Sequence, residues 1–304
     1  MATRSTATLR PPPGDDEGEG PAVPGERPRP FLRRPRFATV ALALPVAFMV
    51  LVYAYPVGAM LLKSVTEPEF GFGNFGRAVS DATTWHALGV TVRMSAEVAV
   101  LTVLLGFPVA YVLARVTARA ARILSVLVVI PFWTSVLVRS FAWIVLLGDG
   151  GVVPRLLSPF TGDTAGLLYS EAAVVIALTH ILLPFPILII KGTLDQIDDS
   201  LVRAARTLGA GPVRAFLRVY LPLAFPAIVS SGMLVFVIGL GFYVTPALVG
   251  GPKESTIAVV IAQSVQVTFD WGLAAALATM LLVVAVALTV IVRRLTKVKG
   301  LVSL

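Results

Sequence analysis

The sequence predicts an all-α, polytopic membrane protein with six transmembrane helices. Of its 304 residues, 57% are apolar and only 14% are charged, and the mean hydropathy is +0.87. An average soluble domain is about 45–50% apolar and about 25% charged, so a soluble chain of this length could not cover such an apolar interior. The composition therefore excludes an ordinary soluble enzyme and a disordered chain, and the lack of Cys excludes a disulfide scaffold.

Charge-free stretches mark the expected spans, since a helix needs about 20 mostly apolar residues to cross a bilayer. Residues 1–36 are polar and rich in Pro and Gly, so we expect a disordered cytoplasmic tail before a first transmembrane helix at 37–65. A transmembrane domain is expected over 86–293, and a short basic cytoplasmic tail over 294–304. Its spans are expected at 86–114, at 123–147 as one long helix, at 172–190, within 219–252 and at 271–292.

The placement of Lys and Arg predicts the orientation of these spans. Nineteen of the 25 basic residues fall in the N-terminal tail, in the loops at 115–122 and 191–218, and after residue 292, whereas four fall in the other loops. Basic residues collect on the cytoplasmic side of a membrane, so both termini are expected in the cytoplasm. The same asymmetry accounts for the net charge of +8 without nucleic acid as a partner.

The loop between the fourth and fifth spans has a helical pattern of its own. Its apolar positions, at helical spacing, are Ile197, Leu201, Ala204 or Ala205, and Leu208. Asp198, Asp199 and Ser200 suit the start of this helix, Gly209 and Gly211-Pro212 suit its end, and a second short basic helix is expected at 213–220. Three interpretations are open: a helix held at the interface by anionic lipid, a docking helix for a cytoplasmic partner, and, least favoured, a DNA-binding helix.

Several stretches of the chain resemble one known family. Ala204-Ala205, three residues, Gly209, nine residues and then Val219-Tyr220-Leu221-Pro222 resembles the Glu-Ala-Ala loop of ABC importer permeases, although Arg203 stands where that family usually has Glu. Residues 131–139, 242–251 and 106–115 are similar to motifs of the spermidine/putrescine permeases in the third, fifth and second spans. The chain thus resembles type I, MetI-like ABC importer permeases, and among them the spermidine/putrescine subfamily.

The resemblance implies a non-catalytic translocation subunit with a cytoplasmic coupling helix between spans four and five. The implied partners are a cytoplasmic dimer of ATP-binding subunits, which would hold ATP and Mg²⁺, a second and paralogous permease, an extracytoplasmic substrate-binding protein and the bilayer of a bacterial inner or plasma membrane. The implied docking residues are Ile197, Leu201, Arg203, Ala204, Ala205, Leu208, Gly209, Leu221 and Pro222. The implied cargo is spermidine, putrescine or a similar small polar solute. The sequence has no Gly-x-x-x-x-Gly-Lys-Ser/Thr loop for ATP phosphates, and no cofactor is expected on it.

Few polar residues fall inside the expected spans, and they are candidates for a translocation path. The candidate path residues are Glu97, Arg139, Thr245 and Pro246. Arg93 and Glu97 are four residues apart and are expected to pair, and His180 is expected to form an interhelical hydrogen bond. With no Cys and two His, no metal site and no catalytic constellation is expected. The alternative function is a secondary transporter or channel that works without an ATPase, which leaves the docking loop unexplained.

Overall fold

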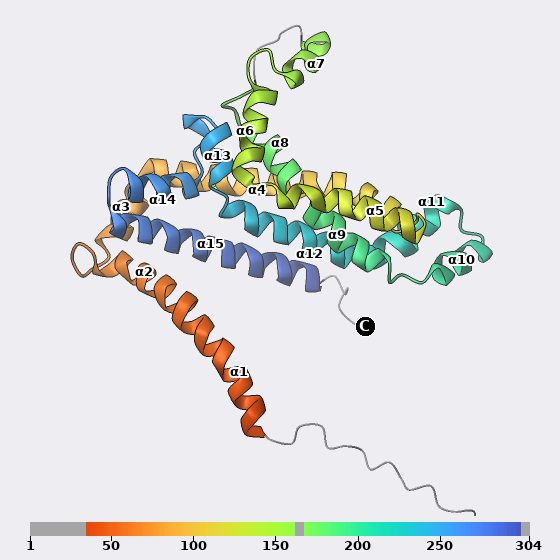
Figure 1. The fold of residues 1–304 in the computed structure, drawn as a ribbon, viewed down its shortest axis with the longest axis horizontal. Helices are drawn as coiled ribbons and strands as arrows, with labels where there is room; N and C mark the ends of the chain where they lie inside the picture. The colour runs from red at the N-terminus through yellow and green to blue at the C-terminus, as the bar shows by residue number, and fades with distance from the viewer. Residues whose placement is uncertain (1–34, 162–166, 299–304) are drawn as a thin grey trace, which may run out of the picture. The chain divides into compact units, whose positions relative to one another are not determined.

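In the computed structural model, which describes residues 35–161 and 167–298, every regular element is a helix (Figure 1). The predicted all-α fold is confirmed. The chain divides into two compact units at Ala54 and Tyr55. The first unit contains α1 (Pro35–Met49) and the π-helix η1 (Val50–Ala54). Residues 1–34 of the predicted N-terminal tail and 299–304 of the predicted C-terminal tail lie outside the described residues.

The second unit contains the remaining helices. They are α2 (Tyr55–Thr66), α3 (Gly73–Ser80), α4 (Ala82–Leu113), α5 (Ala118–Val129), η2 (Ile130–Trp133), α6 (Val136–Leu147), α7 (Val152–Thr161), α8 (Glu171–Leu182), α9 (Pro184–Leu194), α10 (Asp199–Thr207), α11 (Pro212–Ala215), η3 (Phe216–Tyr220), α12 (Leu221–Leu240), α13 (Val244–Val249), η4 (Pro252–Glu254), α14 (Ile257–Gln266) and α15 (Trp271–Val298). Within this unit α4, α12 and α15 run side by side, and α9 packs against both α4 and α12 (Figure 1).

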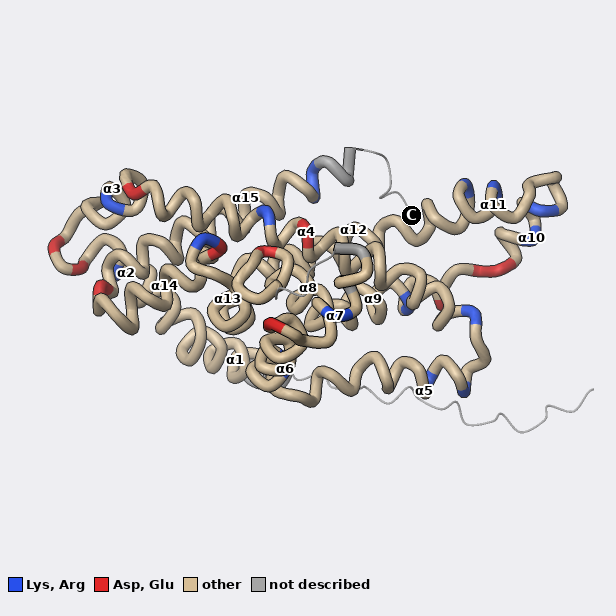
Figure 2. Tube along the Cα trace, turned by 90° about the horizontal axis from the view of Figure 1, so that it is seen from above, with Lys and Arg blue, Asp and Glu red and all other residues tan. Residues whose placement is uncertain are grey.

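Four helical stretches of the described residues are long and apolar enough to cross a membrane alone. They are Leu42–Thr66, Ala82–Leu113, Pro212–Leu240 and Trp271–Arg294. Two bent pairs of helices bring the number to six if each pair crosses as one span, which agrees with the sequence prediction. Figure 2 shows basic residues on α5, α10 and α11 toward one end of the second unit.

The third span is not the single long helix expected over 123–147, and that prediction is wrong. The chain bends by 93° between η2 and α6. Pro131 in η2 cannot donate a backbone hydrogen bond, and Thr134 is extended. Ser135 then accepts a hydrogen bond from the Leu137 N–H at 3.3 Å and starts α6 as a new helix. Apolar composition alone predicts continuity because it carries no information on this local capping.

The fourth span bends by 42° between α8 and α9. Pro184 and Pro186 both lie at this bend, and neither has the N–H that would bond to the carbonyl four residues earlier. The carbonyls of His180 and Leu182 are therefore left without their usual helical donors. A bend at this place is the physical consequence of the two prolines, and the span still reads as one apolar segment from Glu171 to Leu194.

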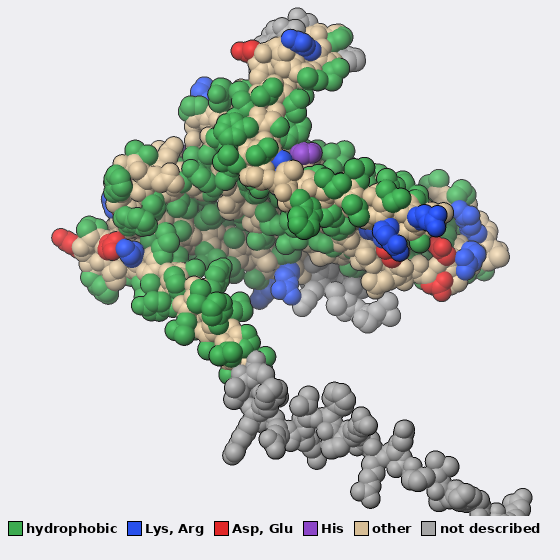
Figure 3. Space-filling view, in the orientation of Figure 1, with side chains coloured by type: hydrophobic (Ala, Val, Ile, Leu, Met, Phe, Trp, Pro, Cys, Tyr) green, Lys and Arg blue, Asp and Glu red, His purple; other side chains and the backbone are tan. Residues whose placement is uncertain are grey.

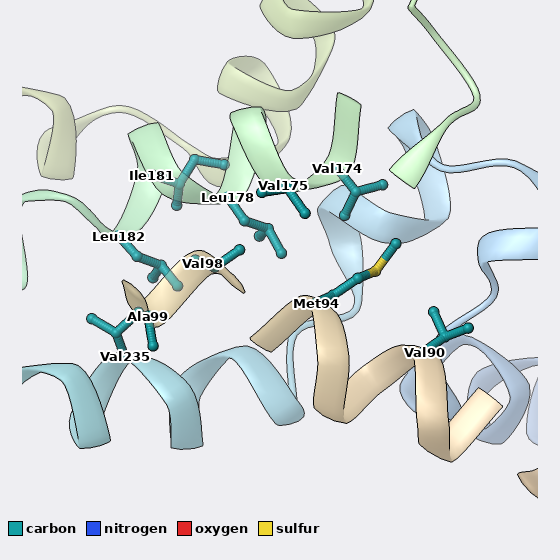
Figure 4. Packing of buried hydrophobic residues seen from close by; sticks show 10 residues of the cluster. All are labelled: Val90, Met94, Val98, Ala99, Val174, Val175, Leu178, Ile181, Leu182 and Val235. Carbon is teal, nitrogen blue, oxygen red and sulfur yellow. The ribbon is translucent and has the colours of Figure 1, made fainter. Parts of the chain in front are cut away.

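Side chains from α4, α8 and α12 form the main hydrophobic core of the second unit (Figure 4). Two glycines of α12 allow the close approach of α4. A Cβ at Gly239 would lie 3.0 Å from Ser95 Oγ and 3.3 Å from its Cα, and a Cβ at Gly232 would lie 3.2 Å from Val103 Cγ2. Small residues at a crossing let two membrane helices pack backbone against backbone, so α4 and α12 form a tight pair.

Large apolar side chains also cover the outside of the second unit. Figure 3 shows hydrophobic side chains over most of the visible face. Ile123 on α5 is 63% exposed, Val145 on α6 is 75% exposed and Val283 on α15 is 61% exposed. A soluble monomer rarely exposes so much contiguous apolar surface. Such a surface suits lipid or another membrane subunit, in agreement with a multi-pass membrane protein.

Candidate docking loop and polar residues within the spans

The helix that the sequence predicts in the loop after the fourth span is present as α10. Asp198 is its N-cap residue, and its carboxylate accepts a hydrogen bond from the Ser200 N–H at 2.8 Å. Hydrogen bonds from Ser200 hold the pKa of Asp198 below its usual value. The carboxylate thus stays ionised and satisfies a backbone donor at the positive end of the helix.

The end of α10 is a Schellman motif. The Gly209 N–H bonds to the Arg206 carbonyl at 3.0 Å, and the Ala210 N–H bonds to the Ala205 carbonyl at 3.0 Å. Gly209 has φ +87°, a left-handed conformation that favours glycine. No atom lies within 4 Å of a Cβ built at Gly209, so backbone conformation alone, and not crowding, requires glycine at this position.

Two large apolar side chains are accessible on α10 and at its end, among exposed polar residues. Leu201 is 48% exposed and Leu208 is 88% exposed. Leu208 lies beside Ala205 and Gly209 in the lining of a groove of about 300 Å³, which α11 and η3 complete. Three of the predicted docking residues therefore lie together at one groove.

The other predicted docking residues are placed differently. Ile197 precedes α10 and packs, partly buried, against the hydrophobic cluster beneath the loop. Arg203 and Ala204 are exposed on α10, and no ion pair joins Arg203 to another residue of the described ranges. Leu221 and Pro222 are the first two residues of α12 and do not line the groove.

The loop continues into the fifth span without a break. Residues Pro212–Leu240, made of α11, η3 and α12, form one helical stretch of 29 residues. The short basic helix predicted at 213–220, leading into the fifth span, is therefore present as α11 and η3, and it forms the first turns of that span. The π-helical turn Phe216–Tyr220 lies just before Pro222, whose missing N–H frees a carbonyl of that turn. A proline thus changes the hydrogen-bond pattern here without ending the helix.

Arg115, directly after α4, is a residue that the sequence analysis did not select. Its guanidinium lies 5.2 Å from the ring centre of Tyr111 and 4.9 Å from that of Tyr220. Its Nη2 lies 3.6 Å from Oδ1 of Asp199, the first residue of α10. The spacing of Tyr111 and Arg115 on one helix face is visible in the sequence, but the fold alone brings Tyr220 and Asp199 to them.

The ion pair expected between Arg93 and Glu97 is wrong. Arg93 instead forms a bidentate pair with Glu171 at the start of α8: its Nε donates to Oε1 at 2.6 Å, and its Nη2 donates to Oε2. The packing of α8 on α4 places a carboxylate opposite the guanidinium fork, a stronger geometry than two flexible side chains on one helix surface. Glu97 is partly buried and has no ion pair within the described ranges.

The expected interhelical hydrogen bond of His180 is confirmed. Nε1–H of Trp143 on α6 donates to Nδ1 of His180 on α8 at 3.3 Å, and the rings lie 5.5 Å apart. Arg139 precedes Trp143 by one helical turn, and its Nε and Nη1 are buried without a hydrogen-bond partner among the described residues. Buried donors of this kind call for an acceptor, so Arg139 stays a candidate path residue.

Thr245 and Pro246, the other path candidates, lie inside the protein. Both are buried in α13, and Thr245 Oγ1 lies 2.9 Å from Ser140 Oγ on α6. This hydrogen bond joins α13 to α6 and satisfies both hydroxyl groups at one contact. Within the described residues, no three His, Asp or Glu side chains gather in the manner of metal ligands.

A model of a known protein family matches the part of the chain that contains the docking loop and most of the spans described above. The family model for the inner membrane component of binding-protein-dependent transport systems matches residues 102–298, which is more than half of the chain. The chain belongs to this family. The resemblance to ABC importer permeases that the motifs carry is thereby confirmed, and the matched range includes the whole of α10 with its exposed groove.

Curated relatives are members of this permease family. The spermidine/putrescine transport system permease protein PotB of Haemophilus influenzae is 29% identical over 247 residues, which cover 81% of this chain and 82% of that protein. The molybdenum transport system permease protein ModB of Mycobacterium bovis is 32% identical over 245 residues, with 80% and 89% covered. The chain is therefore a permease subunit of an ABC importer.

Solved permease structures share the fold. A bacterial ABC transporter that imports the acidic polysaccharide alginate has a TM-score of 0.66 and 20% identity, with 86% of this chain and 95% of that chain covered. The MetNI methionine ABC transporter in an inward-facing conformation has a TM-score of 0.56 and 17% identity, with 72% and 98% covered. At these identities the likeness establishes the arrangement of the spans and no more.

Proposed function

We propose that this permease subunit works in an ATP-driven importer in which α10 docks on a cytoplasmic dimer of ATP-binding subunits. The construction of the loop carries the proposal: Leu208 is 88% exposed beside a groove, and the loop continues directly into the fifth span. An exposed apolar residue at a rigid helix end suits insertion into a partner surface. The continuous helix Pro212–Leu240, which follows α10 after a short turn, then transmits the movement of that partner into the membrane.

In this proposal ATP and Mg²⁺ bind the partner subunits, and the chain itself is non-catalytic. Its segment Gly250-Gly251-Pro252-Lys253-Glu254-Ser255 has the residue types of a phosphate loop but not the spacing. The placement of 19 of 25 basic residues supports both termini and α10 on the cytoplasmic side of a bacterial inner membrane. Energy for transport therefore enters the membrane through the docking loop.

The proposed cargo is spermidine, putrescine or a similar small polar solute, delivered by an extracytoplasmic binding protein. PotB proteins of two organisms at 29% identity support this cargo class. A second permease, a paralogue of this chain, completes the pore. The exposed apolar side chains of α5 and α6, such as Ile123 and Val145, give such a subunit a surface to cover.

Purification of the tagged chain from its own membrane tests the docking proposal. We expect an ATP-binding subunit to co-purify in stoichiometric amount, and the reconstituted complex to import labelled spermidine only with ATP and the cognate binding protein. If the chain purified alone and transported solute at full rate in liposomes without ATP, the proposal would be wrong and a secondary transporter would replace it. If the complex assembled but did not import spermidine, the cargo alone would be wrong.

A further inference from the structure

A cation–π clasp joins three separate parts of the second unit at the end that carries the docking loop. We define the clasp as Arg115, Tyr111, Tyr220 and Asp199. The guanidinium of Arg115 lies 4.9 Å from the ring centre of Tyr220 and 5.2 Å from that of Tyr111. The two rings lie 5.3 Å apart at an interplanar angle of 87°. One cation therefore contacts the end of α4 and the start of the fifth span at the same time.

The aromatic rings of the clasp are held in place by hydrophobic packing. Tyr220 is only 2% exposed and belongs to the hydrophobic cluster formed by α4, α9 and the start of the fifth span. Phe216 packs edge-on against Tyr111 at 5.6 Å and stacks on Tyr220 at 5.8 Å. Because these rings come from α4 and from the π-helical turn η3, they fix the cytoplasmic-side ends of two spans against each other. Arg115 therefore has a defined position on a rigid support.

The charged side of the clasp reaches the docking helix. Nη2 of Arg115 lies 3.6 Å from Oδ1 of Asp199 in the first turn of α10. Asp198 caps the helix with its own carboxylate, so the carboxylate of Asp199 is not needed as the cap and can pair with Arg115. Among the ion pairs of the described residues, this one joins α10 to a membrane span. The start of α10 is thus tied to the ends of the second and fifth spans.

The chemistry of the clasp requires arginine. A planar guanidinium can present its face to aromatic rings and its edge to a carboxylate at the same time. An ammonium group would keep the positive charge but not this double geometry. A cation that served only the inside-positive topology, or only the negative end of α4, would be equally well supplied by Lys. The Arg-to-Lys exchange therefore separates the clasp from a general requirement for charge.

We propose that Arg115 is the positioning residue that transmits displacement of the docking helix to the second and fifth spans, by linking the Asp199 carboxylate of α10 to the rings of Tyr111 and Tyr220. This inference rests on the proposed docking of α10 on an ATP-binding partner. When the partner moves α10, the clasp moves the ends of α4 and of the fifth span together with it. Without the clasp, α10 stays docked, but its first turn slides relative to the spans.

The test uses the complete importer in liposomes, with ATP-binding subunits and the cognate binding protein loaded with spermidine. ATP hydrolysis is measured with and without the loaded binding protein, because its stimulation requires communication between the two sides of the membrane. We expect Arg115→Gln and Arg115→Lys to co-purify with the ATP-binding subunit and to keep their basal hydrolysis. Stimulation by the loaded binding protein should fall about fivefold, the scale of losing an exposed cation–π contact together with an exposed ion pair.

Two further variants distinguish positioning from a merely structural role. Tyr220→Phe keeps the ring and should retain nearly full stimulation, whereas Asp199→Asn should reproduce much of the loss. Arg119→Gln is the matched control, because Arg119 lies four residues further along the chain at the start of α5, is exposed and forms no ion pair within the described ranges. A purely structural defect would lower basal hydrolysis and yield together and leave the stimulation ratio unchanged.

Three results would overturn the proposal: full stimulation in Arg115→Gln, full stimulation in Arg115→Lys, or loss of co-purification in either variant. Full stimulation in Arg115→Gln would show that Arg115 has no role in transmission. Full stimulation in Arg115→Lys would show that only its positive charge is needed. Loss of co-purification would show that Arg115 acts in assembly of the complex. A wild-type chain that binds no ATP-binding subunit would instead refute the docking proposal on which this inference rests. The two failures are thus distinguished by the wild-type control.

Discussion

Arg93 of α4 and Glu171 of α8 are joined by two hydrogen bonds, although 77 other residues separate them along the chain. The pair lies at the start of α8, far along the chain from α10, and it fixes α8 against the long central helix. A bidentate arginine–carboxylate contact defines both distance and orientation. It therefore specifies how α8 sits on α4 more than it adds to stability.

The first prediction concerns this pair. Glu171→Gln should lower the stability of the purified chain by no more than about 1 kcal/mol, because partly exposed ion pairs are worth little and the Arg93 side chain is 58% exposed. Glu97→Gln should change it by less than about 0.5 kcal/mol. Thermal unfolding in detergent measures both, and the exchange of the two charges, Arg93→Glu with Glu171→Arg, should restore the loss. A larger effect of Glu97→Gln would contradict the pairing.

The second prediction concerns the end of the docking helix. Gly209→Ala should destabilise the loop by about 1 kcal/mol, since its φ of +87° strains any residue with a Cβ. Gly211→Ala is the matched control, because Gly211 has φ −61° and open space around it. Gly209→Trp, or bulky residues at Ala204 and Ala205, should leave membrane insertion intact and abolish co-purification of the ATP-binding subunit. Normal assembly and transport of these variants would refute the docking assignment.

The third prediction concerns the unusual charge of the docking loop. Arg203→Glu introduces the residue that the permease family usually has, and it should be tolerated or improve coupling with ATP-binding subunits of related importers. The expected change in affinity is about fivefold, the scale of one exposed ion pair. Arg206→Glu on the same helix is the control, and affinity is measured by titration of the ATP-binding subunit. Complete loss of coupling in Arg203→Glu would mean that the partner surface is adapted to arginine.

The fourth prediction concerns the crossing of α4 and α12. Gly239→Val should cost about 1–3 kcal/mol through overpacking, because a Cβ there would lie 3.3 Å from the Ser95 backbone. Gly192→Ala in α9 is the control, since nothing lies within 4 Å of its Cβ position, and it should be neutral or stabilising by up to about 1 kcal/mol. Thermal unfolding compares the two. Equal stabilities would show that the close crossing carries no energetic weight.

The fifth prediction concerns pH. Arg77 donates to Asp270 at 2.7 Å, and this hydrogen bond holds the pKa of Asp270 below its usual value, with the Leu273 N–H also contributing. A carboxyl group with a lowered folded-state pKa contributes full stability above its unfolded pKa, and this contribution is lost as pH falls through the folded pKa. Asp270→Asn should therefore lower stability at neutral pH by about 1 kcal/mol or less.

The difference between wild type and Asp270→Asn should shrink as pH falls below about 4, the usual pKa of Asp. Unfolding curves between about pH 6 and pH 2 measure this convergence. A difference that stayed constant through the acid range would show that the charge of Asp270 does not act, and that its side chain matters only as a hydrogen-bond acceptor for the start of α15.

Composition and local pattern determined the membrane class, the apolar segments of up to six spans and the helix after the fourth span. Long charge-free segments must leave water whatever their partners, and the cap at Asp198 and the glycine at Gly209 act within one helical turn. Features of this kind depend on neighbours in the chain. The sequence by itself therefore placed α10 correctly and assigned the permease family.

Tertiary structure alone decided the contacts between distant segments. It gave Arg93 the partner Glu171 instead of Glu97, and it placed Arg115 between Tyr111 and Tyr220. A periodic pattern identifies which face of a helix is apolar but not which other helix meets it. Ion pairs and cation–π contacts require atoms within a few ångströms, and only the packing of helices brings segments separated along the chain to that distance.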